Sequence, residues 1–319
     1  MVSSRRSQVD LPWGIRYHRR YLGGGGKVSE MLVPLLKTMR PKQWTKNAFV
    51  LAALVFDAKL FVPHYLFKAV AAVALFCAIS GAVYLINDLV DVEKDRQHPA
   101  KRNRPLASGQ LAPRVAVTAA VVLVLSSLVL SYLLDPFFAL IAAAYLLLMV
   151  LYSFWLKNVV IVDVLMVAVG FVLRVAAGVV IVRAERFSPW LYLCMVFLAL
   201  FIAISKRRHE LVLLNANANA HRTIFDEYNM ALLDDMIRMV TASTAMAYSL
   251  YTFSAPNLPQ NHTMMLTIPF VLYGLFRYMY LVRVKGEGGT PEDLILEDRP
   301  LLLASVLWGL TATTILYLF

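Results

Sequence analysis

Residues 84–105 read Tyr84-Leu-Ile-Asn-Asp-Leu-Val-Asp-Val-Glu-Lys-Asp-Arg-Gln-His-Pro-Ala-Lys-Arg-Asn-Arg-Pro105, so an acidic cluster and then a basic one follow a long apolar run. That run begins near residue 66 and is long enough for a helix to cross a bilayer. Charged side chains are costly in hydrocarbon, so the chain leaves the membrane within this segment. The segment therefore marks the end of a membrane-spanning helix.

The composition extends this prediction to the whole chain. Of the 319 residues 60% are hydrophobic, and the mean hydropathy is +0.64, which excludes a soluble globular domain. We predict an all-α membrane protein with a flexible, basic cytoplasmic tail over residues 1–36 and one transmembrane domain over residues 37–319. The domain is expected to hold nine transmembrane helices around a cavity that faces the cytoplasm. The predicted spans are 44–62, 66–90, 114–134, 136–155, 159–182, 188–205, 231–254, 263–284 and 300–318, with breaks at Pro63, Pro113, Pro136, Pro189 and Pro300.

Basic residues predict how these spans are oriented. Ten Lys and Arg lie between the N-terminus and Lys46, and others fill alternate loops, whereas the opposite side holds only Lys59, Lys68, Arg183 and Arg186. Lys and Arg near span ends are retained in the cytoplasm, so we expect a multi-pass protein of the plasma (inner) membrane with a cytoplasmic N-terminus. The net charge of +11 then reflects topology and attraction to anionic lipid, and we expect no nucleic-acid partner.

Three polar residues of the opening segment recur at a spacing of four. On a helix Asn87, Asp91 and Asp95 share one face, because each lies about 40° further round than the last. Mg²⁺ takes a few protein oxygens and completes its shell with water and phosphate, so this face is a candidate metal site. The cations that follow suit the charge of a diphosphate; they are Lys101, Arg102 and Arg104. The alternative is a solvated cap at the membrane edge.

Further candidates lie at other span ends. Lys46 lies just inside the first predicted span, where snorkelling to the interface and contact with a substrate are both open. Asp163 and Arg174 are eleven residues apart, so they point the same way on one helix, either as a structural pair or as a functional site. Positive-inside bias explains part of the run Lys206-Arg207-Arg208.

Several kinds of catalytic site are not evident in the sequence. We find no Ser-His-Asp arrangement, Walker loop, Cys-His metal spacing or dinucleotide fingerprint. Cys77 and Cys194 both fall in apolar spans and are expected to be packing residues. Any nucleophile must therefore come with a substrate, or there is no reaction.

The motif at residues 87–95, with Arg104-Pro105-Leu106-Ala107-Ser108-Gly109 after it, resembles the first aspartate motif of the UbiA intramembrane prenyltransferase superfamily. The resemblance covers roughly residues 37–319. More narrowly, the chain is similar to the decaprenyl-phosphate phosphoribosyltransferase branch at residues 40–47, 98–102, 170–174, 188–190, 206–207 and 291–293. Aromatic-prenylating relatives carry a second Asp-rich motif where this chain has Lys206-Arg207-Arg208. Cations there suit a site that holds the phosphates of two substrates.

This resemblance implies a Mg²⁺-dependent glycosyltransferase (pentosyltransferase). It would move 5-phosphoribose from 5-phosphoribosyl 1-diphosphate to a polyprenyl (decaprenyl) phosphate, releasing diphosphate and giving a precursor of lipid-linked arabinose for cell-wall biogenesis. The catalytic residues implied are Asp91, Asp88 and Lys101. The substrate-binding residues implied are Lys46, Tyr84, Lys101, Arg102, Arg104, Lys157, Arg174 and Lys206. A homo-oligomer is compatible with the sequence.

Two other functions compete with this one. A UbiA-type enzyme can instead move an isoprenyl chain from its diphosphate to an aromatic acceptor such as 4-hydroxybenzoate, but a second Asp-rich motif would then be expected. A transporter or lipid-binding protein can line a substrate path with acidic and basic residues. Transporters often contain paired half-repeats, and the pattern of residues 84–105 has no convincing second copy in the sequence.

Overall fold

The computed structural model describes residues 28–98, 101–184, 188–215, 227–256, 258–287 and 291–318. Every regular element within these ranges is a helix, which confirms the predicted all-α fold. The elements are α1 (Val28–Met39), η1 (Pro41–Leu51), α2 (Ala52–Phe56), α3 (Pro63–Val90), α4 (Val92–Gln97), η2 (Lys101–Asn103), α5 (Pro113–Leu134), α6 (Pro136–Phe154), η3 (Leu156–Asn158), α7 (Val162–Val182), α8 (Pro189–Asn215), α9 (Met230–Ser254), η5 (Thr263–Thr267), α10 (Ile268–Tyr280), η6 (Leu281–Lys285), α11 (Pro291–Glu297) and α12 (Arg299–Leu318).

Seven helical segments in the described part of the chain are long and apolar enough to cross a membrane. They are α3, α5, α6, α7, α8 as far as Leu213, the continuous segment Thr263–Lys285, and α12. The predicted number of nine is therefore not confirmed. The predicted span 44–62 holds the consecutive helices η1 and α2, which end at Phe56, and α9 carries Asp234, Asp235 and Arg238 near its start.

Prolines begin most of the long helices. Helices α3, α5, α6 and α8 each start at a proline, and Pro300 is the second residue of α12, so all five predicted breaks are confirmed. Proline suits the first turn because its fixed φ is helical and the N–H that it lacks would have no partner there. Helix α6 is also capped by Asp135, whose carboxylate accepts hydrogen bonds from the backbone N–H groups of Phe137 (2.8 Å) and Phe138 (3.1 Å).

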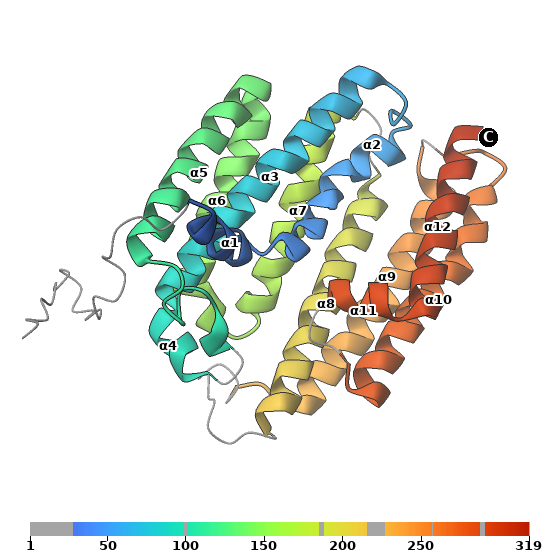
Figure 1. Cartoon of the computed structure of the whole chain (residues 1–319). Helices are drawn as coiled ribbons and strands as arrows, with labels where there is room; N and C mark the ends of the chain where they lie inside the picture. The colour runs from blue at the N-terminus through green and yellow to red at the C-terminus, as the bar shows by residue number, and fades with distance from the viewer. Residues whose placement is uncertain are drawn as a thin grey trace, which may run out of the picture.

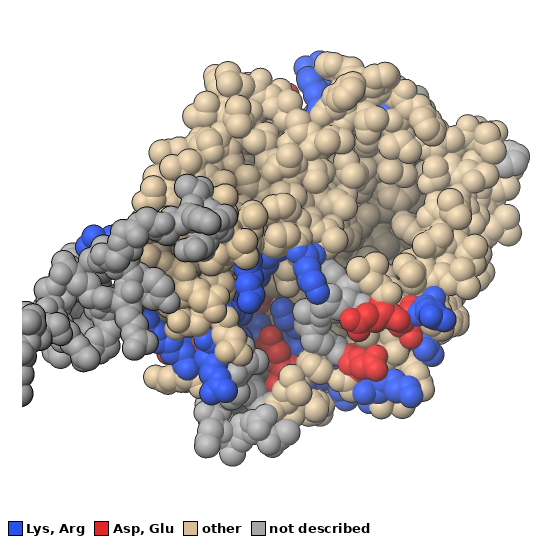
Figure 2. Space-filling model, in the orientation of Figure 1, with Lys and Arg blue, Asp and Glu red and all other residues tan. Residues whose placement is uncertain are grey.

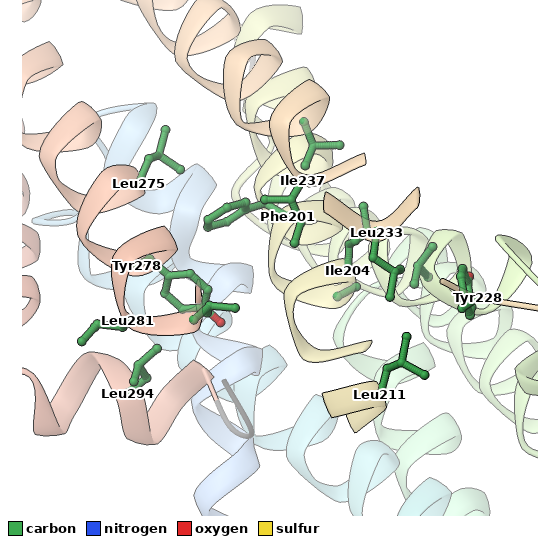
Figure 3. Close-up of a cluster of buried hydrophobic side chains, with 14 of the residues drawn as sticks. Phe201, Ile204, Leu211, Tyr228, Leu233, Ile237, Leu275, Tyr278, Leu281 and Leu294 are labelled. Atoms are coloured by element: carbon green, nitrogen blue, oxygen red, sulfur yellow. The ribbon is translucent and has the colours of Figure 1, made fainter. Parts of the chain in front are cut away.

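Consecutive spans pack side by side. Figure 1 shows α3, α5, α6 and α7 on one side of the molecule and α8, α9, α10 and α12 on the other. The two sides meet where α7 packs on α8, and η1 lies against both α3 and α7. A core cluster closes the second side: Phe201 of α8, Ile237 of α9, Tyr278 of α10 and Leu294 of α11 are all buried in it (Figure 3). Tyr228, just before α9, belongs to the same cluster.

The contact between η1 and α7 is made by backbone. A Cβ added at Gly178 of α7 would lie 2.0 Å from the carbonyl oxygen of Val50 in η1, a distance at which no side chain fits. Only glycine lets the two segments approach this closely. Both residues are buried, with Val50 in a cluster that includes Phe76 of α3 and Phe138 of α6.

Helix α1 occupies part of the predicted tail. It begins at Val28 and packs on α3, with Met39 in a buried cluster and Leu35 packed against it. The last residues of the predicted flexible tail are therefore helical, because they cover apolar residues of α3. Residues 1–27 lie outside the described residues, so a flexible tail remains a prediction for them.

Candidate active site

The acidic residues of the first motif lie where α3 gives way to α4. Helix α3 ends at Val90, and Asp91 has φ −93° and ψ 5° before α4 begins. Hydrogen bonds from Asp91 N–H to the Asn87 carbonyl (3.0 Å) and from Asp95 N–H to the Asp91 carbonyl (2.8 Å) continue the helical pattern through this break. Asp88, Asp91 and Asp95 are all buried, whereas Asn87 is half-buried. Three buried carboxylates this close require counter-charges.

Each of these carboxylates is paired with a cation from elsewhere in the chain. Lys157 donates to both oxygens of Asp91, at 2.7 and 2.8 Å. Arg104 bridges Asp95 (2.6 Å) and Asp88 (3.2 Å). The guanidinium of Arg40 also pairs with Asp88. The structure thus joins Asp88 to Asp95 through one arginine and gives Asp91 a separate lysine.

The predicted metal ligands supply suitable atoms for Mg²⁺. Mg²⁺ is usually held by one or two protein carboxylates plus water and substrate phosphate, and Asp91 and Asp95 offer such oxygens. In the part of the chain described, no group of three or more Asp, Glu, His and Cys side chains is arranged to hold a metal ion. The set Asn87, Asp91 and Asp95 therefore remains a prediction, and a metal would share these carboxylates with Lys157 and Arg104.

The entry into η1 adds a second group of polar side chains. Arg40, with φ 54°, forms the left-handed turn between α1 and η1, and its guanidinium lies 4.8 Å from the centre of the Tyr84 ring. Gln43 accepts hydrogen bonds from Lys46 Nζ (3.0 Å) and from the Tyr84 hydroxyl (3.1 Å). The predicted residues Lys46 and Tyr84 are therefore brought together by Gln43, next to the Arg40–Asp88 pair.

Arg174 is buried in the middle of α7 among neutral partners. It donates to the side-chain oxygen of Asn47 (2.8 Å), to the Gly170 carbonyl (2.9 Å) and to the Tyr145 hydroxyl (2.8 Å). Its guanidinium also lies 4.7 Å from the centre of the Tyr145 ring and 5.6 Å from that of Phe171. None of these partners carries a negative charge, so the described residues orient the guanidinium and leave its positive charge available to an anion.

The end of α8 is arranged differently from the prediction. Arg207 forms ion pairs with Asp163 of α7 (2.6 Å) and with Glu210 (2.6 Å). Asp163 therefore pairs with Arg207, and of the two alternatives left open by the sequence the structure does not show a structural pair of Asp163 with Arg174. The next residue, Arg208, pairs with Asp234 of α9 (2.8 Å). Two of the three consecutive cations are thus engaged by carboxylates.

Tyr228 completes this network. Its hydroxyl donates to Asp163 Oδ1 (2.7 Å) and accepts from the backbone N–H of Ile161 (2.8 Å). Burial and the hydrogen bond to Asp163 raise the pKa of Tyr228 above its ordinary value, so the phenol stays protonated and remains a donor.

The remaining predicted residues surround these groups. Lys101, half-buried, and Arg102, exposed, lie in η2, three and two residues before Arg104 respectively. Lys206 is half-buried and precedes Arg207 in α8. The sequence did not single out Arg40, Gln43, Asn47, Tyr145 or Tyr228 as site residues. For Asn47 and Tyr145 the available signal was a polar group inside a predicted apolar span.

An apolar cavity of about 480 Å³ begins beside the polar cluster. Lys46 and Thr45 of η1 line it at one place, and the rest of its wall is mostly aromatic and aliphatic side chains of α7, α8, α9, α10 and α12. Polar and apolar side chains are also separated on the surface. In Figure 2 most of the charged side chains gather toward one end of the molecule, and most of the remaining surface is uncharged. The site can therefore hold an amphiphile, with its charged group among cations and its apolar part in the cavity.

Comparisons with known proteins show which family the chain resembles in sequence. The model of the UbiA prenyltransferase family matches residues 47–290. Decaprenyl-phosphate phosphoribosyltransferase of Mycobacterium tuberculosis (strain CDC 1551 / Oshkosh) is 34% identical over 284 residues, which cover 88% of this chain and 93% of the relative. The protein of the same name from Corynebacterium glutamicum is 34% identical over 285 residues, covering 86% of this chain and 84% of the relative.

Solved structures show the same fold. A UbiA homolog from Archaeoglobus fulgidus bound to DMAPP and Mg²⁺ superposes with a TM-score of 0.69 at 19% identity, covering 90% of this chain and 100% of that chain. A structure described as digeranylgeranylglyceryl phosphate synthase in membranes gives a TM-score of 0.64 at 16% identity, covering 91% and 100%. With its long apolar helices and its transferase relatives, this multi-pass membrane enzyme is a transferase and belongs to the UbiA prenyltransferase family.

Proposed function

We propose that the protein transfers 5-phosphoribose from 5-phosphoribosyl 1-diphosphate to a polyprenyl phosphate of the decaprenyl type. The bond from ribose C1 to the diphosphate breaks, the diphosphate leaves with the electron pair, and a new bond forms from C1 to an oxygen of the lipid phosphate. That oxygen is ionised near neutral pH, so no general base is needed. The names of the curated relatives support this assignment.

The observation that carries the proposal is the placement of cations on both sides of the acidic cluster, next to an apolar cavity. Lys157, Arg104 and Arg40 contact the carboxylates, while Arg174 has only neutral partners among the described residues. An anionic ligand would compensate the charge of Arg174. Two phosphorylated substrates carry several negative charges, and the excess of cations in the site would balance them.

Roles for individual residues extend the proposal. Asp91, with Asn87 and Asp95, would hold Mg²⁺ on the diphosphate, and Asp88 would orient Arg40 and Arg104. When bound, the metal would neutralise charge that develops on the leaving group. Donor phosphates would contact Lys46, Tyr84, Lys101, Lys157 and Lys206, and the lipid phosphate would contact Arg102, Arg104 and Arg174. Catalysis then consists of positioning the reactants and stabilising an oxocarbenium-like ribosyl centre.

The apolar cavity would take the part of the lipid next to its phosphate. Its volume of about 480 Å³ is that of a site for a drug-sized ligand, so most of a long polyprenyl chain would remain among membrane lipids. A water-soluble sugar donor would enter from the cytoplasm, which agrees with the basic loops predicted on that side of the plasma membrane. The product would serve as a precursor of lipid-linked arabinose.

A lipid-extraction assay tests the reaction. Purified protein would receive Mg²⁺, polyprenyl phosphate and radiolabelled phosphoribosyl diphosphate, and a parallel sample would receive isoprenyl diphosphate and 4-hydroxybenzoate. We expect label in the organic phase that is lost with EDTA. A prenylated aromatic product in the second sample, with no label transferred in the first, would replace the proposed reaction by the alternative one.

Substitution of Asp91 tests the carboxylate cluster. We expect Asp91→Ala to abolish turnover, because it removes a proposed metal ligand and the partner of Lys157. Asp91→Asn keeps an oxygen acceptor for Lys157, so it should stay folded and be equally inactive. Asp235→Ala is the matched control, since Asp235 is exposed and pairs only with Arg238 of its own helix among the described residues. Retained activity of Asp91→Ala at saturating Mg²⁺ would exclude the metal-ligand role.

A further inference from the structure

The turn between η3 and α7 has a backbone conformation that its sequence does not favour. Ile161 has φ 68° and ψ −43°, and the N–H of Val162 donates to the carbonyl of Val160 at 2.8 Å. This is the γ-turn with positive φ, which is rare and strained. A β-branched side chain makes it less favourable still. Such a conformation persists only where surrounding contacts hold it.

Tyr228 makes the contacts that hold this turn. Its hydroxyl accepts the N–H of Ile161 at 2.8 Å, inside the turn, and donates to Asp163 Oδ1 at 2.7 Å, just after it. The other oxygen of Asp163 pairs with Arg207 at 2.6 Å. All three side chains of this network are buried: Asp163 is 0% exposed, Tyr228 4% and Arg207 7%. One hydroxyl therefore links the turn to the start of α7 and, through Asp163, to Arg207 of α8.

The Ile161 turn also determines the position of Lys157. This lysine lies in η3, four residues before Ile161, and is 6% exposed. Its ammonium contacts both oxygens of Asp91 at 2.7 and 2.8 Å, a geometry that depends on where the backbone of η3 lies. The N–H of Asp163 donates to the carbonyl of Val159 at 3.0 Å, so the backbone between Lys157 and α7 is continuous with the turn.

We propose that Tyr228 is a positioning residue that holds the Ile161 turn and thereby keeps Lys157 against Asp91. It acts through the backbone and touches neither the acidic cluster nor, in the proposed function, a substrate. The role depends on the proposed function only in its last step, that the Lys157–Asp91 pair takes part in turnover.

The decisive variant is Tyr228→Phe, which removes one oxygen and keeps the ring in its cluster. Its matched control is Tyr317→Phe. The Tyr317 hydroxyl also accepts a backbone N–H, that of Leu60 at 3.0 Å, but it lies in α12 next to the turn between α2 and α3. The two substitutions therefore remove the same chemical group from the same kind of contact, in two different parts of the molecule.

The first readout is the accessibility of Lys157, which needs no turnover. The full-length protein in detergent would be treated with an amine-reactive ester, and the modification of Lys157 would be followed by mass spectrometry well below the melting temperature. We expect labelling about tenfold faster in Tyr228→Phe, the size expected for loss of a buried hydrogen bond, and unchanged in Tyr317→Phe. Unchanged labelling of Lys157 in a folded Tyr228→Phe protein would overturn the proposal.

A coupling measurement separates positioning from general support of the fold. Glycine adopts positive φ without strain, so Ile161→Gly should relieve the turn of its need for Tyr228. The effect of Tyr228→Phe on Lys157 labelling should then be several-fold smaller in the Ile161→Gly background. An effect of equal size in both backgrounds would mean that Tyr228 does not act through the turn, and would also overturn the proposal.

Turnover is measured in parallel, so that the positioning role of Tyr228 and the proposed reaction are tested separately. In Tyr228→Phe we expect kcat for phosphoribosyl transfer to fall about tenfold, with a smaller change in KM for the lipid phosphate. Faster Lys157 labelling in a protein whose wild type transfers no phosphoribose would leave the positioning role standing and remove the proposed function. Normal kcat together with faster labelling would show that Lys157 is dispensable for the reaction.

Discussion

Two buried arginines on neighbouring helices have opposite surroundings. Arg174 of α7 is 6% exposed and Arg207 of α8 is 7% exposed, so both charges are removed from solvent to the same extent. Arg207 is compensated by Asp163 and Glu210. Arg174 is held by an amide, a backbone carbonyl and a phenol, all neutral.

This difference separates a structural charge from one prepared for a ligand. A buried cation with two carboxylates is already satisfied, and removing it leaves those carboxylates without compensation. A buried cation with neutral partners is oriented but not neutralised, which makes it a strong site for an anion. Of these two arginines, one is compensated by carboxylates and the other has neutral partners among the described residues, which supports the proposed role of Arg174 in binding a phosphate.

The largest effect that the comparison predicts is on stability. Arg207→Met should lower the free energy of unfolding by about 3–5 kcal/mol, because it leaves Asp163 charged and buried. Thermal melting of the detergent-solubilised protein would measure it. Arg238→Met serves as control, since the Arg238–Asp235 pair is exposed on α9 and should contribute little. Equal melting temperatures for both variants would contradict the structural role of Arg207.

The next effect is on activity. Arg174→Met should reduce kcat/KM by about 100-fold, or about 2.7 kcal/mol, because a desolvated charge contact with phosphate is lost. Its loss of stability should be smaller than that of Arg207→Met, since no buried carboxylate is left behind. Arg174→Lys keeps the charge without the fork and should recover only part of the activity. If Arg174→Met unfolds the protein as readily as Arg207→Met does, the distinction between the two arginines is wrong.

A smaller effect on activity tests whether the orientation of the Arg174 guanidinium matters as well as its charge. Tyr145→Phe removes the hydroxyl that accepts from Arg174 and keeps the ring beneath the guanidinium. Loss of one hydrogen bond from the charged guanidinium, with the bonds to Asn47 and Gly170 kept, should lower kcat/KM about tenfold. The control is Tyr132→Phe, because Tyr132 is exposed on α5. A full-activity Tyr145→Phe enzyme would show that the charge of Arg174 suffices.

The smallest effect concerns a third arginine, near the surface. Arg277 donates two hydrogen bonds to Asp298, at 3.1 and 2.8 Å, and these hold the pKa of Asp298 below its usual range. A carboxyl whose pKa is lowered by folding stabilises the protein above its ordinary pKa, and this contribution disappears as the pH falls through the lowered value. Melting curves of wild type and Asp298→Asn should differ at neutral pH and converge in strong acid. A difference that grows on acidification would contradict this assignment.

Local features of the fold followed from the sequence. The apolar runs and the five prolines predicted where most long helices begin, because a helix start is determined by neighbouring residues. The segment 44–62 was predicted as one span, whereas the structure has two consecutive shorter helices there, η1 and α2, which its apolar content does not reveal. The acidic motif was found by its spacing, but its spacing did not show that Asp88 and Asp95 share Arg104.

The partners of the charged residues were beyond the sequence. Lys157 and Asp91 are 66 residues apart, and Arg174 and Asn47 are 127 apart. No local pattern predicts such pairs, because they exist only once the helices have packed. For the same reason the run Lys206-Arg207-Arg208 did not reveal that Arg207 pairs with Asp163 of α7. Charge at a membrane edge shows where a site can be, and packing decides which charges belong to it.

The contact of Gly178 with Val50 implies a narrow tolerance to mutation far from any charged group. A single methyl group at position 178 would meet the Val50 carbonyl oxygen and force η1 away from α7. Segment η1 carries Asn47, which holds the guanidinium of Arg174. Gly178→Ala would thus displace η1 and misalign Arg174 through Asn47, without a direct contact between residue 178 and the arginine. Inherited variation at this glycine should be as poorly tolerated as variation at the arginine itself.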